Sequence, residues 1–329
     1  MTGYDETFTL IERLSSVDAV STDEGDLRAL IKDRLAGLFD SVEEDALGNL
    51  ILSRSGDEPP KTLFAYMDEP GLVVTHVDKD GMLHVAAAGD VSAKEAPGCR
   101  VRFKNGMSGI VVAAGKNQDS ADVASLRIDV GATSREEAER LVRVGARAAF
   151  DVAIVRQGDA VVGKALESRA GCAALIQALE RSQARGLRAV FVAQERLGGR
   201  GLAALASGDR SFGEAVGVSL VDASPGAKES TAVKIGAGPC LVVQDGAHVG
   251  DEAVVEALGA AAEKDGIAVQ RCVSKGGPKG AGILQRAPGG VSLAVLGIPA
   301  RNASGLAQIV HLGDVAAAAK ILGRWADGE

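Results

Sequence analysis

Ninety residues of short, turn-separated strands interrupt an alternation of helices and strands, and this interruption constrains the fold more than any other feature of the chain. From Gly71 to about Ala160, segments such as LVVTHVD, MLHVAAA and RVRFK are separated by turns such as DKDG and KNG. On both sides, helical periodicity alternates with apolar runs. The pattern predicts an α/β domain, a mixed sheet flanked by helices (residues 1–70 and 161–329), with an inserted small β-barrel-like domain (71–160).

Composition narrows the classes of partner. Of 329 residues, 46% are hydrophobic and 24% charged, as in a globular protein, and the net charge of −8 argues against nucleic acid or an anionic membrane surface as a partner. The four cysteines lie far apart, which favours reduced thiols. Neither a signal-peptide pattern nor an apolar run of about 20 residues occurs, so a cytoplasmic protein is expected.

Helical spacing predicts two helices within residues 6–39, joined by the loop VSTDEGD. Ser21, Thr22 and Asp23 in that loop are each suited to cap the second helix, because their side-chain oxygens accept hydrogen bonds from backbone amides. The cap is therefore expected at one of these three residues.

Charged side chains gather where the predicted strands end. In a largely parallel sheet, sites form at the carboxyl ends of strands. The strand ends carry the carboxylates Asp68, Glu69, Glu167, Glu195 and Asp222, and the arginines Arg169, Arg196, Arg200 and Arg301. Carboxylates that converge repel each other unless metal ions or arginines neutralise them. Histidine is absent from these segments, and His76, His84, His248 and His311 are expected at the surface, in strands or outside the motifs.

Several motifs, taken in order along nearly the whole chain, resemble those of the glutamyl and deblocking aminopeptidases. These are co-catalytic metallo-aminopeptidases that form tetrahedral dodecamers, and some members are labelled endoglucanase. The motifs that carry the resemblance are EEDALGNLI (43–51), MDEPGLVVTHVDKDG (67–81), IDVGATSREEAE (128–139), GKALESRAG (163–171) and the closing IPAR…IVHLGDV. The resemblance implies the fold given above, with the insert contributing to contacts in a homo-oligomer, from a dimer up to a dodecamer.

For the first metal and the bridging position, the resemblance implies two sequence changes. The first metal's histidine would stand where this chain has Tyr66, while its orienting aspartate is retained as Asp68. The bridging aspartate is replaced by Glu167, which is longer by one methylene. Asp222 keeps the remaining first-metal ligand. A phenolate of Tyr66 as a residual ligand is a further reading, although a buried, hydrogen-bonded tyrosine is more usual.

For the second metal, the resemblance implies a larger loss. Glu195 holds the general-base position, but Arg196 replaces a glutamate ligand and Ser304 replaces a histidine. A guanidinium is not deprotonated in proteins and cannot bind a metal. Arg196 is therefore expected to supply the positive charge of a lost metal. The segment KGGPKGAGI (275–283) is expected to form a turn near this site, with Lys279 lining the cleft together with Arg169, Arg200 and Arg301.

Two functions remain open on these residues. The first is a catalytically inactive aminopeptidase homologue that acts as a scaffold, regulatory subunit or binder of a peptide or small molecule, with no cofactor. The second is a working hydrolase with one divalent cation (zinc, cobalt or manganese) at Glu167 and Asp222, with Glu195 and Asp68 as catalytic residues. Glu167 and Glu195 could also form a glycosidase pair, but aromatics to stack on sugars make up only 3% of the chain.

Overall fold

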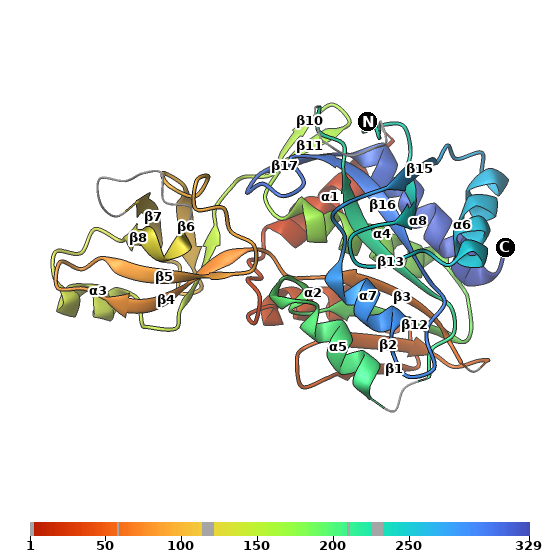
Figure 1. Ribbon diagram of the computed structural model, residues 1–329, viewed down its shortest axis with the longest axis horizontal. Helices are drawn as coiled ribbons and strands as arrows, with labels where there is room; N and C mark the ends of the chain where they lie inside the picture. The colour runs from red at the N-terminus through yellow and green to blue at the C-terminus, as the bar shows by residue number, and fades with distance from the viewer. Residues whose placement is uncertain (1–2, 58, 114–121, 209–210, 226–232) are drawn as a thin grey trace.

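The computed structural model describes residues 3–57, 59–113, 122–208, 211–225 and 233–329. Figure 1 shows two parts, a small barrel on the left and a layered α/β body on the right, where both chain termini lie. The predicted fold class, a mixed sheet flanked by helices with an inserted barrel, is confirmed. Among the described residues, no helix is long and apolar enough to cross a membrane.

The body is built on an eleven-stranded mixed sheet with the order β1-β2-β12-β3-β13-β16-β17-β11-β10, to which β14 and β15 are added beside β16. Strands β12, β3, β13 and β16 are mutually parallel and almost wholly buried. This explains their continuous apolar sequences, because both faces are covered. The strands are β1 (Ser41–Glu44), β2 (Leu50–Arg54), β3 (Lys61–Tyr66), β10 (Val155–Gln157), β11 (Ala160–Gly163), β12 (Leu187–Val192), β13 (Ala215–Asp222), β14 (Cys240–Gln244), β15 (Gln270–Val273), β16 (Leu293–Arg301) and β17 (Gln308–His311).

Helices cover both faces of this sheet and bury two separate apolar cores. The larger core joins one face to α1 (Asp5–Ser15), α2 (Gly25–Arg34), α4 (Leu166–Arg181), α6 (Glu252–Lys264) and α8 (Leu312–Asp327). The smaller core joins the other face to α5 (Arg200–Ser207) and α7 (Lys279–Gln285). Ala and Gly on α4 let it pack tightly against α8 and the strands, which is how a chain with few aromatics fills its core.

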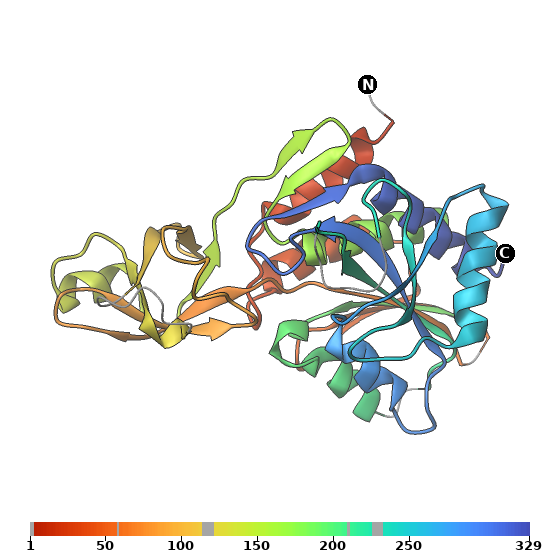
Figure 2. The same cartoon turned by 45° about the horizontal axis from the view of Figure 1, so that its top comes forward.

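The barrel closes through the strand order β4-β5-β8-β7-β6-β9, and it has its own apolar core. Its strands are β4 (Gly71–Val77), β5 (Leu83–Ala88), β6 (Arg100–Phe103), β7 (Ser108–Ala113), β8 (Leu126–Asp129) and β9 (Arg147–Phe150), accompanied by α3 (Arg135–Leu141). Gly71 and Ala149 lie opposite each other in the register of β4 and β9. The chain therefore enters and leaves the barrel at neighbouring points, and Figure 2 shows the barrel projecting from the body there.

Three sequence predictions about local structure were wrong. The N-cap of α2 is Glu24, without a side-chain cap hydrogen bond, because the side chains of Ser21, Thr22 and Asp23 instead contact distant residues. His248 is buried, with its Nδ1 2.9 Å from Asp245 Oδ2. The segment 275–283 is only partly a turn, since α7 begins at Lys279.

Candidate functional site

A polar cavity of about 170 Å³ lies at the carboxyl ends of the parallel strands. Strands β3, β12, β13 and β16, or the loops that follow them, all contribute to it, as expected for a sheet of this type. We call it the cleft. Its lining residues are Tyr66, Asp90, Glu167, Glu195, Arg196, Ser219, Leu220, Asp222, Ser274, Gly276, Gly277, Pro278, Lys279, Ala303 and Ser304.

Glu167 is held in the cleft from both of its carboxylate oxygens. Tyr66 Oη donates to Glu167 Oε1 at 2.9 Å, and Arg196 Nη2 forms an ion pair with Oε2. The backbone amide of Glu167, in the first turn of α4, donates to Gln308 Oε1 at 2.9 Å. Ala165, just before the helix, has a φ of +56°, a strained conformation for alanine of the kind that persists where the surroundings impose it.

Burial and charge make the Tyr66–Glu167–Arg196 group a fixed unit. Burial raises the pKa of Tyr66 well above its ordinary value, and the negative charge of Glu167 adds to this. Burial opposes the charge on Arg196, but attraction from Glu167 and Asp68 outweighs burial and raises the Arg196 pKa. Tyr66 is thus a neutral donor, and Arg196 a permanent cation beside Glu167.

Glu195 points its carboxylate at the start of α7. It follows Gln194, whose φ is +56°, and its Oε1 accepts from the backbone amide of Gly280 at 2.9 Å. A side chain at residue 280 would collide with this carboxylate, so glycine is required there. Burial raises the pKa of Glu195 to about 7, against the opposing hydrogen bond from Gly280. Glu195 can therefore gain or lose a proton near neutral pH.

Asp68 lies beneath the cleft and positions Glu195 and Arg196, the third and fourth residues after β12. Its Oδ1 accepts from the Glu195 amide at 3.2 Å, and its Oδ2 accepts from the Arg196 amide at 2.9 Å. Ser21 Oγ donates to the same Oδ2 at 2.6 Å. The side chain is fully buried, and burial raises its pKa despite these hydrogen bonds. Asp68 therefore acts on the cleft through the backbone amides of Glu195 and Arg196.

Glu24 belongs to this group, although its place in the acidic loop VSTDEGD gave no sign of it. It is buried, and its Oε1 accepts from the Gln194 amide at 2.9 Å. Burial raises its pKa, and the nearby charge of Asp68 raises it further. Two buried carboxyls, Glu24 and Asp68, thus hold the 194–196 turn from below.

Asp222, Ser304 and Lys279 line the remaining walls of the cleft. Asp222 Oδ1 accepts from the amide and the hydroxyl of Ser224, at 3.0 and 2.6 Å, so the end of β13 orients this carboxylate. Lys279 is exposed at the start of α7. The cleft therefore offers both acidic and basic groups to a polar ligand.

Three arginines expected along the cleft lie elsewhere. Arg169 has no exposed surface, and it donates to the backbone carbonyls of Leu14, Val17 and Met67. Arg200 begins α5 and Arg301 ends β16, and neither is among the residues that line the cavity. None of the four histidines lines it either.

The donor set in the cleft does not fit a pair of catalytic metal ions. Both oxygens of Glu167 already accept from Tyr66 and Arg196, and the guanidinium is a cation with no lone pair to offer. Within the described ranges, no group of three or more histidine, cysteine, aspartate or glutamate residues has the geometry to hold a metal. The cleft can instead bind polar groups through Arg196, Lys279, Glu195 and Asp222.

Comparison with known proteins identifies relatives over almost the whole length. A family model described as M42 glutamyl aminopeptidase matches residues 48–321. A protein of Acetivibrio thermocellus that carries the name "Putative aminopeptidase" is 31% identical over 323 residues, 97% of this chain and 98% of the relative.

Two solved structures show the same architecture. The aminopeptidase APDkam598 of the archaeon Desulfurococcus kamchatkensis superposes with a TM-score of 0.90 at 28% identity, covering 98% of this chain and 95% of its own. PhTET1-12s, a dodecamer in its asymmetric unit, superposes with a TM-score of 0.87 at 26% identity, covering 97% and 98%. The body and the inserted barrel thus have counterparts in both proteins.

Proposed function

The chain belongs to the M42 glutamyl aminopeptidase family, and from that premise we propose that it is a degenerate member whose two-metal peptidase centre is lost. In this proposal the cleft binds a peptide or another small polar molecule. The protein then acts as a binder, a regulatory subunit or a scaffold, without a metal cofactor.

One observation carries this proposal, the ion pair between Arg196 and Glu167. By the resemblance described above, Glu167 stands at the position of the bridging carboxylate and Arg196 at that of a second-metal ligand. The guanidinium of Arg196 now contacts one carboxylate oxygen of Glu167, and Tyr66 donates to the other oxygen. Arg196 thus replaces the electrostatic role of a metal while it blocks the ligand.

The catalytic consequence follows from what metals supply in such enzymes. Two-metal hydrolases lower the pKa of a bound water and polarise the scissile carbonyl. Here Glu195 keeps the general-base position, but the residues around it do not fit a metal that could activate a water. Retention of Asp68, Glu195 and Asp222 is then explained by cleft geometry and ligand binding.

The test is metal content measured by elemental analysis, after exposure of the purified protein to excess zinc, cobalt and manganese followed by desalting. We expect near-zero metal per chain. The matched control restores the residues implied by the resemblance, with Tyr66→His, Glu167→Asp, Arg196→Glu and Ser304→His, and should retain up to about two ions per chain. Metal held stoichiometrically by the unmodified chain would overturn the proposal.

A second candidate, a working hydrolase, is favoured by one observation. The pKa of Glu195, raised by burial to about 7, is suited to a general base at neutral pH. Glu167 and Asp222 would hold its single cation. Release of amine from aminoacyl and peptide substrates, abolished by Glu195→Gln and by chelator, would support this candidate. Absence of turnover with all three metals would leave the binding function.

We also propose a homo-oligomer. The support is the likeness to PhTET1-12s, a dodecamer, together with a barrel that projects from the body and leaves a second surface for contacts. Native mass spectrometry would give the number of chains. A monomer at micromolar concentration would contradict this part of the proposal and leave the cleft unaffected.

A further inference from the structure

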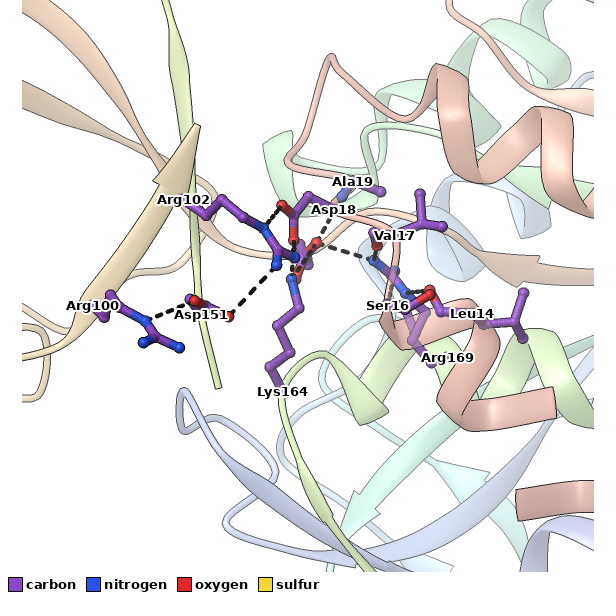
Figure 3. Close-up of polar contacts among 12 residues, drawn as sticks. Leu14, Ser16, Val17, Asp18, Ala19, Arg100, Arg102, Asp151, Lys164 and Arg169 are labelled. Carbon is purple, nitrogen blue, oxygen red and sulfur yellow. Dashed lines mark hydrogen bonds and ion pairs between the residues drawn. The ribbon is translucent and has the colours of Figure 1, made fainter. Parts of the chain in front are cut away.

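A cluster of ion pairs joins the barrel to the body where the chain crosses between them (Figure 3). Arg102 on β6 donates to both oxygens of Asp18, Nε to Oδ2 at 2.8 Å and Nη2 to Oδ1 at 2.9 Å. Asp18 lies in the loop between α1 and α2 and also pairs with Lys164. We call these three residues the joint.

The joint continues into the buried base of the body. Lys164, with 4% of its side chain exposed, lies 3.1 Å from Glu69 Oε2, and Glu69 is 2% exposed. Glu69 Oε1 accepts from Arg169 Nη2 at 3.1 Å and from the Ala19 amide at 2.6 Å. Buried, charge-assisted contacts of this kind fix geometry, because breaking one leaves an uncompensated charge.

A short segment, residues 18–21, connects the joint to the cleft. At one end Asp18 accepts hydrogen bonds from the guanidinium of Arg102, and at the other end Ser21 Oγ donates to Asp68 Oδ2. Between them, the segment runs alongside Glu69: the Glu69 amide donates to Ala19 O at 2.9 Å, and the Ser21 amide donates to Glu69 O at 3.4 Å. The segment therefore forms a continuous path of contacts, four residues long, from Asp18 to Asp68.

Asp68 completes the connection, because it accepts hydrogen bonds from the backbone amides of Glu195 and Arg196. Those two residues carry the groups that line the cleft. We propose that Arg102 of the barrel is a positioning residue for the cleft, acting through Asp18, Ser21 and Asp68 on the turn that holds Glu195 and Arg196. The orientation of the barrel and the shape of the cleft are then coupled.

Such coupling works in both directions. Whatever contacts the barrel and turns it changes the cleft, and a ligand in the cleft changes the barrel's preferred orientation by the same free energy. The inference deepens the proposed binding function. Only the effect of a ligand in the cleft rests on that function. The path from Arg102 to Glu195 is tested without any ligand.

Hydrogen exchange measured by mass spectrometry provides that test, with peptides covering 194–197 as the readout. Arg102→Gln should accelerate exchange there by roughly 2- to 30-fold, the range typical of coupling along a contact path. The matched control is Arg100→Gln, because Arg100 pairs with Asp151 at 2.7 Å on the same barrel but does not reach Asp18. This control should leave exchange at 194–197 unchanged.

A double-mutant cycle identifies the route. Ser21→Ala should also accelerate exchange at 194–197, and Arg102→Gln should add nothing further in the Ser21→Ala background. If Arg102→Gln proves too unstable to measure, Arg102→Lys keeps the charge but loses the two-pronged contact, and a smaller acceleration is expected. Equal effects of Arg102→Gln and Arg100→Gln, or acceleration confined to the barrel, would overturn the inference.

Failure here is separate from failure of the proposed function. Metal bound by the unmodified chain would overturn the binding proposal and leave the exchange result standing. Unchanged exchange in Arg102→Gln would remove the coupling and leave the metal result standing.

Discussion

Two groups of buried charge, only a few residues apart in the chain, are built on opposite principles. At the joint and in the buried contacts beside it, the acids Asp18 and Glu69 meet the bases Arg102, Lys164 and Arg169. In and beneath the cleft lie the acids Glu24, Asp68, Glu167 and Glu195, and within the described residues their one side-chain ion pair is that between Glu167 and Arg196.

The difference appears directly in the titration of the acids. Burial disfavours the charge on Asp18, but the contacts of Arg102 and Lys164 outweigh it and lower the Asp18 pKa. In the cleft, burial raises the pKa of Glu195 to about 7 and also raises that of Asp68. The joint is thus neutralised and stabilises the fold, whereas the cleft keeps acids at a cost in stability, as functional sites do.

The largest effect on stability is expected from Arg169→Met. Arg169 is fully buried, and its removal takes a donor from three backbone carbonyls and leaves Glu69 with Lys164 but without the arginine. We expect the free energy of unfolding to fall by about 4 kcal/mol, the range for breaking a buried pair. Urea unfolding measures it. A loss under about 1 kcal/mol would mean that the buried charges beside the joint do not stabilise the fold.

A smaller but still large loss is expected from Arg196→Glu in chelator. The substitution would place a new carboxylate against Glu167 and remove the arginine that pairs with it. We expect a loss of roughly 3 kcal/mol, reduced when zinc is supplied, because a dication would neutralise the acids. The control is Arg196→Met, which removes the cation without adding a ligand and should not respond to zinc. Equal stability of Arg196→Glu and the parent in chelator would count heavily against the proposed role of Arg196.

The raised pKa of Glu195 predicts a pH dependence with a definite sign. The unfolded carboxyl ionises near its ordinary pKa and the folded one at about 7. Between those values the native state holds the extra proton, so stability is present below the lower pKa and is lost as pH rises through about 7. Glu195→Gln should therefore gain about 3 kcal/mol relative to the parent at pH 8 and almost nothing at pH 4.

Chemical unfolding of both proteins across that pH range checks the prediction. Glutamine keeps an oxygen for the Gly280 amide, so the substitution removes only the charge. If the free energy of unfolding of parent and variant varied with pH in parallel, ionisation of Glu195 would not destabilise the fold.

The smallest effect is expected at an exposed pair that serves as a baseline. Arg34 Nε lies 2.6 Å from Glu180 Oε1, but the two side chains are 38% and 22% exposed. Arg34→Ala should cost about 0.5 kcal/mol or less, since solvent screens such pairs. A cost comparable to that of Arg169→Met would show that burial is not what separates the joint from ordinary surface charge.

Long apolar runs made the sheet predictable from the sequence. Strands β12, β13 and β16 are covered on both faces, so their residues had to be continuously apolar. The start of α4 is hard to place from the sequence, because Leu166–Arg169 precede the run of alanines and resemble a strand-end loop. Strand β14 and the edge strand β15 together bury few residues, and β14 was not recognised at all.

The cleft was predictable where it rests on strand ends, and unpredictable where it rests on tertiary burial. Tyr66, Glu167, Glu195, Arg196 and Asp222 come together as strand-end residues. Glu24 was missed because an acidic loop looks solvated until its partners, the amides of the 194–196 turn, are placed in space. A signal did exist for Arg169, since it lies two residues from Glu167 on α4, roughly 200° around the helix, and both cannot face the cleft.

The neighbouring entry and exit of the barrel also bear on how the chain folds. Strand β3 pairs with β12, although roughly 120 residues separate Tyr66 from Leu187, and closing so long a loop is slow. Barrel strands pair over shorter separations and bring Gly71 beside Ala149, which leaves an effective loop of about 40 residues and lowers the closure cost by about 1 kcal/mol. If the barrel forms early during synthesis, β3 and β12 are joined by a shorter effective loop and pair faster.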